Sequence, residues 1–261
     1  MRTPSSKPSK FVFPTLICAQ AVSRSADGND QGAYAVFCVT DFWQHFALGA
    51  DGAGKAEARQ AYNVALAASE IPTLQHYLFS TLPNASEISG GKHPVPHFDH
   101  KARIDDRIRA ELPELARKTT FIWLGWYSAN LASPGFMRFF EPPQSGGKYV
   151  WMQPSRPHAL LPTAGDVAVN LGVFALAALN HPDKSRGRYV FVCTDVFTFV
   201  QITKEWERVT GIQAEYVPIS ANGLERIWGP GGKEMALQMA FGEDCDDESC
   251  LLGPASAYDR S

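Results

Sequence analysis

Two hydroxyls, a histidine and a lysine have types and spacings that could handle a carbonyl group and a hydride. Ser80 and Thr81 end a run of strand-forming residues that starts at His76. His97 and Lys101 follow at the head of a helix-favouring stretch, and their four-residue offset places both side chains on one helix face. A hydroxyl at a strand end, a proton-transfer group and an amine together predict a catalytic set of Thr81, His97 and Lys101.

The polar residues around His97 leave three interpretations open. A neutral imidazole at His97 could accept a proton near pH 7. The same residues could instead form a solvated first helical turn with no part in catalysis. His93, Asp99 and His100 also suggest metal ligation, but residues 97, 99 and 100 point in different directions on a helix. We therefore expect no metal site.

A glycine-rich stretch imitates a nucleotide-binding loop. Residues 49–55 match the pattern G-x-x-x-x-G-K, but Ala56 replaces the hydroxyl residue that binds magnesium. The preceding apolar run ends at Thr40, too far upstream for a tight strand-to-helix loop. We interpret the glycines as a flexible loop before a helix. Lys55, close to the start of that helix, could still reach a phosphate.

Alternating strands and helices must position these residues. In the first half, the patterns predict strands at residues 33–40, 76–81 and 119–125 and helices at 55–70 and 98–111. In the second half, they predict strands at 149–152, 188–194 and 215–218 and helices at 166–179 and 200–210, the last capped by Gly211. Continuous apolar strands that alternate with helices predict an α/β fold with a parallel sheet.

Composition narrows the class of function. The 261 residues carry a formal net charge of −3 without a basic stripe, which argues against nucleic-acid binding. No apolar run approaches the roughly 20 residues that a membrane span needs. The five cysteines are an odd number, which indicates reduced thiols and a cytoplasmic protein. Residues 11–21 also resemble a short signal peptide, but Pro14 interrupts it.

Four segments of the chain resemble the NmrA-like family, the atypical short-chain dehydrogenases that include fungal regulators and oxidoreductases. These segments are residues 32–43, 79–85, 95–101 and 125–131, and the similarity runs from about Gly32 to about Pro218. The resemblance implies a Rossmann-like parallel sheet that binds NAD(P) at its C-terminal edge. It also implies a smaller C-terminal α/β lobe for a small-molecule substrate.

The resemblance also implies site residues by position. The implied cofactor contacts are Thr40, Asp41, Phe42, Lys55, Lys101, Tyr127 and Asn130. In dehydrogenase relatives a tyrosine lies four residues before the lysine, and His97 takes that place here. Because His97 replaces this tyrosine, the chain departs from the residue pattern of dehydrogenases that carry out ordinary carbonyl reduction.

The start of the chain departs further from the family. The family begins with a strand, a G-x-x-G-x-x-G loop, a helix and a second strand, and nothing before Gly32 supplies them. At about 30 residues per βα unit, roughly 60 residues are missing. The resemblance therefore implies an N-terminally truncated member in which NADP binding is weak or lost and an apolar sheet edge is exposed.

The expected organisation has four parts. They are an irregular N-terminal segment at 1–31, a partial Rossmann domain at 32–133, a substrate lobe with returning Rossmann elements at 134–242, and an acidic disordered tail at 243–261.

Three functions fit these expectations. The first is an NAD(P)-dependent oxidoreductase that acts on a carbonyl or enone, for example in fungal secondary metabolite biosynthesis, with His97 and Thr81 managing the proton and the oxyanion. The second is a non-catalytic regulator that binds a partner protein. The third is a cofactor-independent isomerase or cyclase that reuses the pocket.

Overall fold

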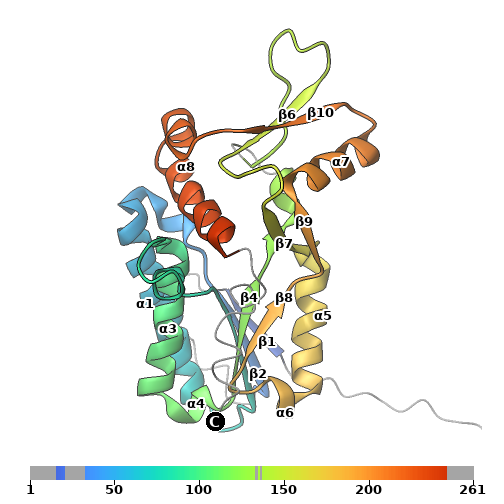
Figure 1. Ribbon diagram of the computed structural model, residues 1–261. Coiled ribbons are helices and arrows are strands. Elements are labelled where there is room, and N and C mark those ends of the chain that lie inside the picture. The colour runs from blue at the N-terminus through green and yellow to red at the C-terminus, as the bar shows by residue number, and fades with distance from the viewer. Residues whose placement is uncertain (1–15, 21–32, 133–134, 136, 246–261) are drawn as a thin grey trace, which may run out of the picture.

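A five-stranded parallel sheet forms the centre of the computed structural model, which describes residues 16–20, 33–132, 135 and 137–245 (Figure 1). The strands lie in the order β1-β2-β3-β4-β8, and every neighbouring pair is parallel. Their bounds are β1 Leu16–Gln20, β2 Ala35–Val39, β3 His76–Thr81, β4 Thr119–Leu124 and β8 Tyr189–Val192. The predicted α/β class with a Rossmann-like parallel sheet is confirmed.

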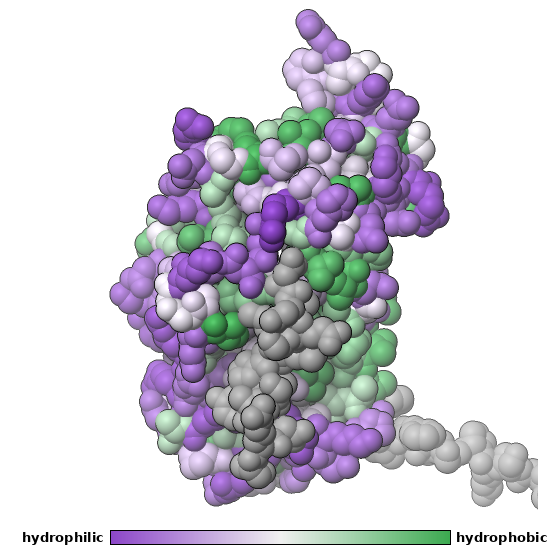
Figure 2. Space-filling model, viewed as in Figure 1, coloured by the Kyte–Doolittle hydropathy of each residue, from purple (hydrophilic) through white to green (hydrophobic). Residues whose placement is uncertain are grey.

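Helices cover both faces of this sheet. On one face lie α1 Gly49–Ser69, α3 Pro96–Glu111 and α4 Pro113–Ala116, and on the other lie α5 Val167–Asn180 and α6 Pro182–Ser185 (Figure 1). Alanines dominate the buried side of α1, so that this helix packs closely against α3. On α5, Val169, Val173 and Leu176 instead form an exposed apolar stripe, while hydrophilic residues dominate much of the face shown in Figure 2.

The second half of the chain adds a smaller lobe above the sheet. It contains a parallel pair, β6 Tyr149–Gln153 with β10 Ala214–Pro218, and a three-stranded sheet of β5 Trp126–Tyr127, β7 Leu160–Gly165 and β9 Asp195–Thr198. Its helices are α7 Phe199–Thr210 and α8 Ala221–Asp244. The fully buried Trp151 lies in the core of this lobe. Helix α8 runs from the lobe back toward the main sheet (Figure 1).

Short helical segments connect these elements. They are η1 Trp43–Leu48 before α1, α2 Ala85–Ile88 before α3, and η2 Ser128–Leu131 after β5. Gly211 adopts the left-handed conformation that ends α7, as the sequence predicts. Among the helices of the described residues, none is both long and apolar enough to cross a bilayer.

The structure corrects three expectations about the ends of elements. Residues 16–20, expected to be irregular, form β1 beside β2, so the edge of β2 that was expected to be exposed is paired along Ala35–Val39. The remainder of the 1–31 segment lies outside the described residues. Helix α1 begins at Gly49 rather than at Lys55. Glu243 and Asp244, expected in the disordered tail, belong to α8, and residues 246–261 lie outside the described residues.

The cysteines also differ from expectation in part. Cys38 and Cys193 are not disulfide-bonded, in line with the expectation of reduced cysteines. Cys245 is disulfide-bonded, so that expectation is wrong at this position.

The loop-like glycines at 49–55 serve helix packing. Gly49 has φ +75° and joins η1 to α1, a conformation that favours glycine. A Cβ at Gly54 would lie 2.1 Å from Cδ2 of His100, because the His100 ring fills the space that Gly54 leaves. The glycine at position 54 therefore lets α3 approach α1. Helix packing thus accounts for a glycine that the sequence pattern shares with nucleotide-binding loops.

Gly54→Ala is expected to lower the free energy of unfolding by ~1–3 kcal/mol, because the new methyl group displaces the His100 ring. Gly172→Ala, at an exposed α5 position with open space around it, is the matched control and should raise that free energy by about 0.5–1 kcal/mol. Chemical denaturation measures both. If steric conflict is the cause, Gly54→Ala should cost nothing in a His100→Ala background; a cost that persists there would contradict it.

A buried histidine at the start of β3 makes stability depend on pH. The Thr120 hydroxyl donates to Ser185 O at 3.0 Å, so it accepts from Nε2–H of His76 at 2.7 Å. Nδ1 of His76 has no hydrogen-bond partner among the described residues, and burial with a smaller effect of Arg186 lowers the pKa of His76 to about 4. The folded protein therefore holds His76 neutral.

The free energy of unfolding should fall as the pH drops from 6.5 toward 4, because in this window the unfolded chain binds the His76 proton and the folded chain does not. Above pH 6.5 this contribution is fully present. Its slope approaches about 1.4 kcal/mol per pH unit. Denaturation across this range should show a flatter profile for His76→Gln than for the wild type, and parallel profiles would contradict the assignment.

Candidate functional site

A cavity of about 350 Å³ opens at the carboxyl edge of the main sheet; we call it the main cavity. Its wall comprises the residues after β2 (Thr40–Trp43), the end of β3 (Ser80–Leu82), the end of β4 with β5 (Leu124–Tyr127), Asn130 and Met137, His97, Phe98 and Lys101 of α3, and Met235 and Gln238 of α8. The carboxyl edge is where open parallel α/β sheets bind ligands, and the volume lies in the range of small-molecule sites.

The sequence-predicted site residues meet in this cavity with one exception. Those that line it are Thr40, Asp41, Phe42, Thr81, His97, Lys101, Tyr127 and Asn130. Lys55 does not line it, and its contact with a cofactor phosphate stays a prediction. Its ammonium lies 2.6 Å from Asp51 Oδ2, one helical turn earlier on the exposed side of α1.

Lys101 belongs to a buried ion pair. Its ammonium lies 2.7 Å from Glu57 Oε1 and donates to Thr40 Oγ1 at 2.8 Å and to Thr40 O at 3.2 Å. The Thr40 hydroxyl in turn donates to Glu57 Oε1 at 2.9 Å. Glu57 is 1% exposed and Lys101 9% exposed, so each charge depends on the other for compensation. The lysine therefore anchors the end of β2, and its charge is already neutralised within the cavity wall.

Sequence reasoning missed Glu57, although the helix pattern contains a signal for it. Positions 53, 57, 61 and 65 repeat at four-residue intervals along the buried side of α1, and all except Glu57 are alanine. An acidic residue in such a stripe has to find a buried cation.

His97 is held by α8, an element that the sequence analysis did not predict. Its Nδ1 lies 2.7 Å from Glu234 Oε1, which also accepts the His97 backbone N–H at 3.0 Å. Nε2 lies 3.1 Å from Gln238 Oε1. The buried carboxylate of Glu234 therefore orients the ring with the proton on Nδ1, and Nε2 is the nitrogen that remains for proton exchange.

The sequence contains only a weak signal that Glu234 and Gln238 lie on a helix. They are four residues apart, as are Met235 and Met239, but they follow a stretch rich in glycine and proline. Gly229, with φ +64° and ψ −148°, breaks α8, and Pro230 begins the second half. Proline is tolerated at such a start because its missing N–H has no helical partner there.

Aromatic rings surround His97. The ring centroids of Phe42, Trp43 and Phe98 lie 5.6, 5.8 and 4.7 Å from the imidazole centroid. These rings limit access of water to the imidazole and provide flat apolar walls for a ligand.

The remaining polar residues near His97 have separate structural partners. Asp99 accepts from the backbone N–H of Val95 at 3.1 Å and of Ser86 at 3.0 Å, which ties the start of α3 to α2. His100 lies 3.3 Å from Asp51, and burial lowers the pKa of its imidazole. Within the described part of the chain, no group of three or more His, Cys, Asp or Glu residues is placed to hold a metal ion.

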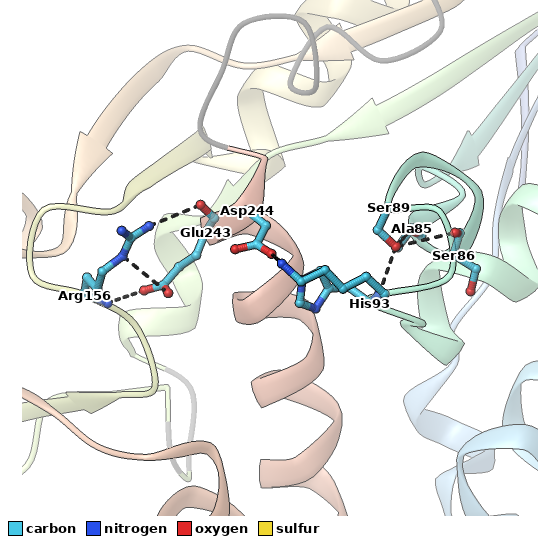
Figure 3. Close-up of polar contacts among 8 residues, drawn as sticks. Ala85, Ser86, Ser89, His93, Arg156, Glu243 and Asp244 are labelled. Carbon is cyan, nitrogen blue, oxygen red and sulfur yellow. Dashed lines mark hydrogen bonds and ion pairs between the residues drawn. The ribbon is translucent and has the colours of Figure 1, made fainter.

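Figure 3 shows that the C-terminal end of α8 makes polar contacts on both sides. His93 Nε2 lies 2.6 Å from Asp244 Oδ2, and Lys92 pairs with the same carboxylate. Hydrogen bonds from Lys92 and His93 lower the pKa of Asp244 to about 2. On the opposite side, Arg156 Nε lies 3.5 Å from Glu243 Oε2. These contacts hold α8 over the carboxyl edge of the sheet.

Thr81 is bonded away from the cavity. Its hydroxyl donates to Asp105 Oδ2 at 3.1 Å, and the Tyr189 hydroxyl donates to the same oxygen at 3.1 Å. Burial raises the pKa of Asp105 well above its usual range. An oxyanion contact from Thr81 would require this hydroxyl to turn from Asp105 toward the cavity.

These features define the class of protein. A parallel α/β sheet with a ligand-sized cavity at its carboxyl edge is a Rossmann-like arrangement. The chain belongs to the NmrA-like family, whose family profile matches residues 30–249.

Relatives of this chain include both regulators and an oxidoreductase. The NmrA-like family domain-containing protein of Dictyostelium discoideum is 26% identical over 174 residues, 64% of this chain and 54% of that protein. The nitrogen metabolite repression protein nmrA of Emericella nidulans is 25% identical over 184 residues, which cover 69% of this chain and 51% of that protein. The oxidoreductase hkm9 of Aspergillus hancockii is 24% identical over 163 residues, which cover 57% of this chain and 45% of that protein. The chain thus spans about half the length of these relatives.

Solved structures with the same fold bind nicotinamide dinucleotides. The negative transcriptional regulator NmrA superposes with a TM-score of 0.67 at 22% identity, over 87% of this chain and 67% of that one. The complex of NmrA with NADP superposes with a TM-score of 0.62 at 24% identity, over 82% of this chain and 62% of that one. The NADPH-dependent quinone oxidoreductase QOR2 of Escherichia coli, in complex with NADPH, superposes with a TM-score of 0.53 at 16% identity, over 85% of this chain and 71% of that one.

Glu57→Gln is expected to lower the free energy of unfolding by about 3 kcal/mol, because it leaves the Lys101 ammonium buried without a counter-charge. Chemical denaturation measures the effect. The double variant Glu57→Gln/Lys101→Met should recover a large part of the loss. Asp51→Asn, which breaks an exposed pair on the same helix, is the control and should have far less effect. Equal effects of the two single acidic substitutions would contradict a stabilising buried pair.

Proposed function

We propose that this chain is an NAD(P)-dependent oxidoreductase that reduces a carbonyl or enone group in the main cavity. The observation that carries this proposal is the position of His97: its Nδ1 is bound to the buried Glu234, while the ring lines a cavity at the carboxyl edge of the sheet. A fixed, largely buried imidazole in a cavity wall is suited to proton transfer to a substrate oxygen. The family relationship, which includes NAD(P)-binding reductases, supports the proposal.

The residues present fit the ring end of a nicotinamide dinucleotide. Phe42, Trp126 and Tyr127 supply flat walls, and the Asn130 amide can hydrogen-bond a carboxamide. When bound, the coenzyme supplies a hydride. Asp41 and Phe42, which follow β2, would lie along it.

The charged part of such a coenzyme fits the main cavity less well. The two cationic or potentially cationic residues of its wall, Lys101 and His97, each face a buried carboxylate, Glu57 and Glu234. Phosphate groups would therefore have to be held outside the main cavity. This arrangement suits a coenzyme that inserts only its ring.

The protein's own groups then have distinct tasks. The Glu234 carboxylate keeps the Nδ1 proton of His97 in place, so that the imidazolium form of the ring donates its Nε2 proton to the substrate oxygen and is left as the neutral Nδ1–H tautomer. Gln238 can accept from a protonated Nε2 or, with its amide turned over, donate to a neutral one. Lys101 acts as a positioning residue that holds Thr40 and the end of β2.

The regulator hypothesis is the second candidate, and the comparisons support it as well. The structure of NmrA, a negative transcriptional regulator, has been solved with NADP, so dinucleotide binding alone does not distinguish an enzyme from a regulator. Turnover distinguishes them, and turnover without any coenzyme would favour the isomerase or cyclase.

The purified chain should bind NADPH and oxidise it in the presence of aryl ketones or cyclic enones. His97→Ala should lower kcat by roughly 10²–10⁴-fold, the range of general acid catalysis, while the Kd for NADPH changes by less than about threefold. Stopped-flow absorbance and isothermal titration calorimetry measure the two quantities. His181→Ala, at an exposed position beyond α5, is the matched control.

No NADPH binding at millimolar concentration would overturn the proposal. Tight NADPH binding without turnover of any carbonyl substrate would favour the regulator.

A further inference from the structure

A second cavity adjoins the main cavity on the side of the smaller lobe; we call it the inner cavity. It has about 110 Å³ of free volume, roughly enough for one aromatic ring. The two cavities share Phe98, Gly125 and Trp126 as common walls. A molecule whose reacting group lies beside His97 could therefore extend a ring into the inner cavity.

The wall of the inner cavity is almost entirely apolar. Trp123 at the end of β4, Phe199 of α7, and Met239 and Phe241 of α8 are each buried. These side chains belong to three different elements, so the cavity exists only where the main sheet, the lobe and α8 meet. Its shape and chemistry suit a flat hydrocarbon ring.

Three residues of this wall each carry a buried polar atom that lacks a partner. The indole nitrogens Nε1 of Trp123 and Trp126 and the hydroxyl of Ser155 have no hydrogen-bond partner among the described residues. The three residues are only 3%, 7% and 4% exposed. An unsatisfied buried donor destabilises the folded state by about 1–3 kcal/mol, so such a group commonly marks a place where another molecule provides the acceptor.

The charges of the wall further narrow the chemical class of the ligand. Among the described wall residues, Glu243 alone is charged, and its carboxylate is paired with Arg156 at the rim. An anionic ligand would meet no free cation there. Indole N–H groups only donate, so the complementary groups on a ligand are neutral oxygen acceptors.

We infer that the inner cavity binds the ring system of the substrate, an uncharged, flat and apolar molecule with carbonyl or ether oxygens that accept from Trp123 and Trp126. This assignment rests on the proposed function for the reacting end, which lies in the main cavity. It adds the substrate class: a carbonyl compound fused to or carrying an apolar ring, rather than a small hydrophilic aldehyde, a sugar or an acid. Trp123, Trp126 and Ser155 are its specificity residues.

The test compares two probes that share one carbon skeleton. 1-Tetralone has a ketone on a fused bicyclic ring, and tetralin has the same ring without oxygen. Binding is followed by ¹H–¹⁵N NMR of the tryptophan indoles in the absence of any nucleotide. 1-Tetralone should shift the indole signals of Trp123 and Trp126 and should bind about tenfold more tightly than tetralin, the difference expected for a lost acceptor.

Conservative variants identify the donors. Trp123→Phe and Trp126→Phe keep a ring and remove the N–H, so each should weaken 1-tetralone binding about five- to tenfold and leave tetralin binding nearly unchanged. Trp206→Phe is the matched control, because Trp206 does not line the inner cavity; it lines another cavity beside α7, which Trp126 also borders. Thermal unfolding verifies that each variant is folded, and the comparison of the two probes on the wild type does not depend on any variant.

Equal affinity for the two probes, or unchanged 1-tetralone binding in both tryptophan variants, would overturn the inference. Because no nucleotide is present, the result is independent of the proposed reaction. Retained 1-tetralone binding by a chain that does not bind NADPH at millimolar concentration would overturn the oxidoreductase proposal alone.

Discussion

The buried pair of Lys101 and Glu57 is the interaction on which the site depends. It joins α3 to α1 and, through Thr40, both helices to the end of β2. Because the pair lies at the carboxyl edge of the sheet, it fixes the position of the loop that carries Asp41 and Phe42. His97 lies one turn before Lys101 on the same helix, so the position of the imidazole follows from the same anchor.

Local sequence patterns predicted the strands and helices that are encoded by a single continuous run of residues. Strand β3 was predicted at His76–Thr81 and occurs there, because a continuously buried apolar run has few alternatives. Since parallel strands end at one edge, the residues after β2, β3 and β4 lie close together, and most predicted site residues share one cavity. Lys55 lies outside this cavity on the exposed side of α1, because the position of a residue near a helix start does not determine which way its side chain points.

The contacts that complete the site depend on distant parts of the chain. Glu234 lies 137 residues from His97, within a helix that is broken at Gly229 and contains several glycines and Pro230. Such residues usually end helices, so α8 was not predicted. Strand β1 was missed for a related reason: its short apolar run resembles a signal peptide, and only pairing with β2 makes it a strand. Tertiary contacts decide these cases.

The break at Gly229 separates α8 into two halves. Leu224 before the break and Met239 after it are both buried in the core of the smaller lobe. In the second half, Glu234 and Gln238 also contact His97, and Met239 and Phe241 line the inner cavity. The second half is thus a shared wall of both cavities. A substitution that displaces this half of α8 would therefore change the volume of both cavities together.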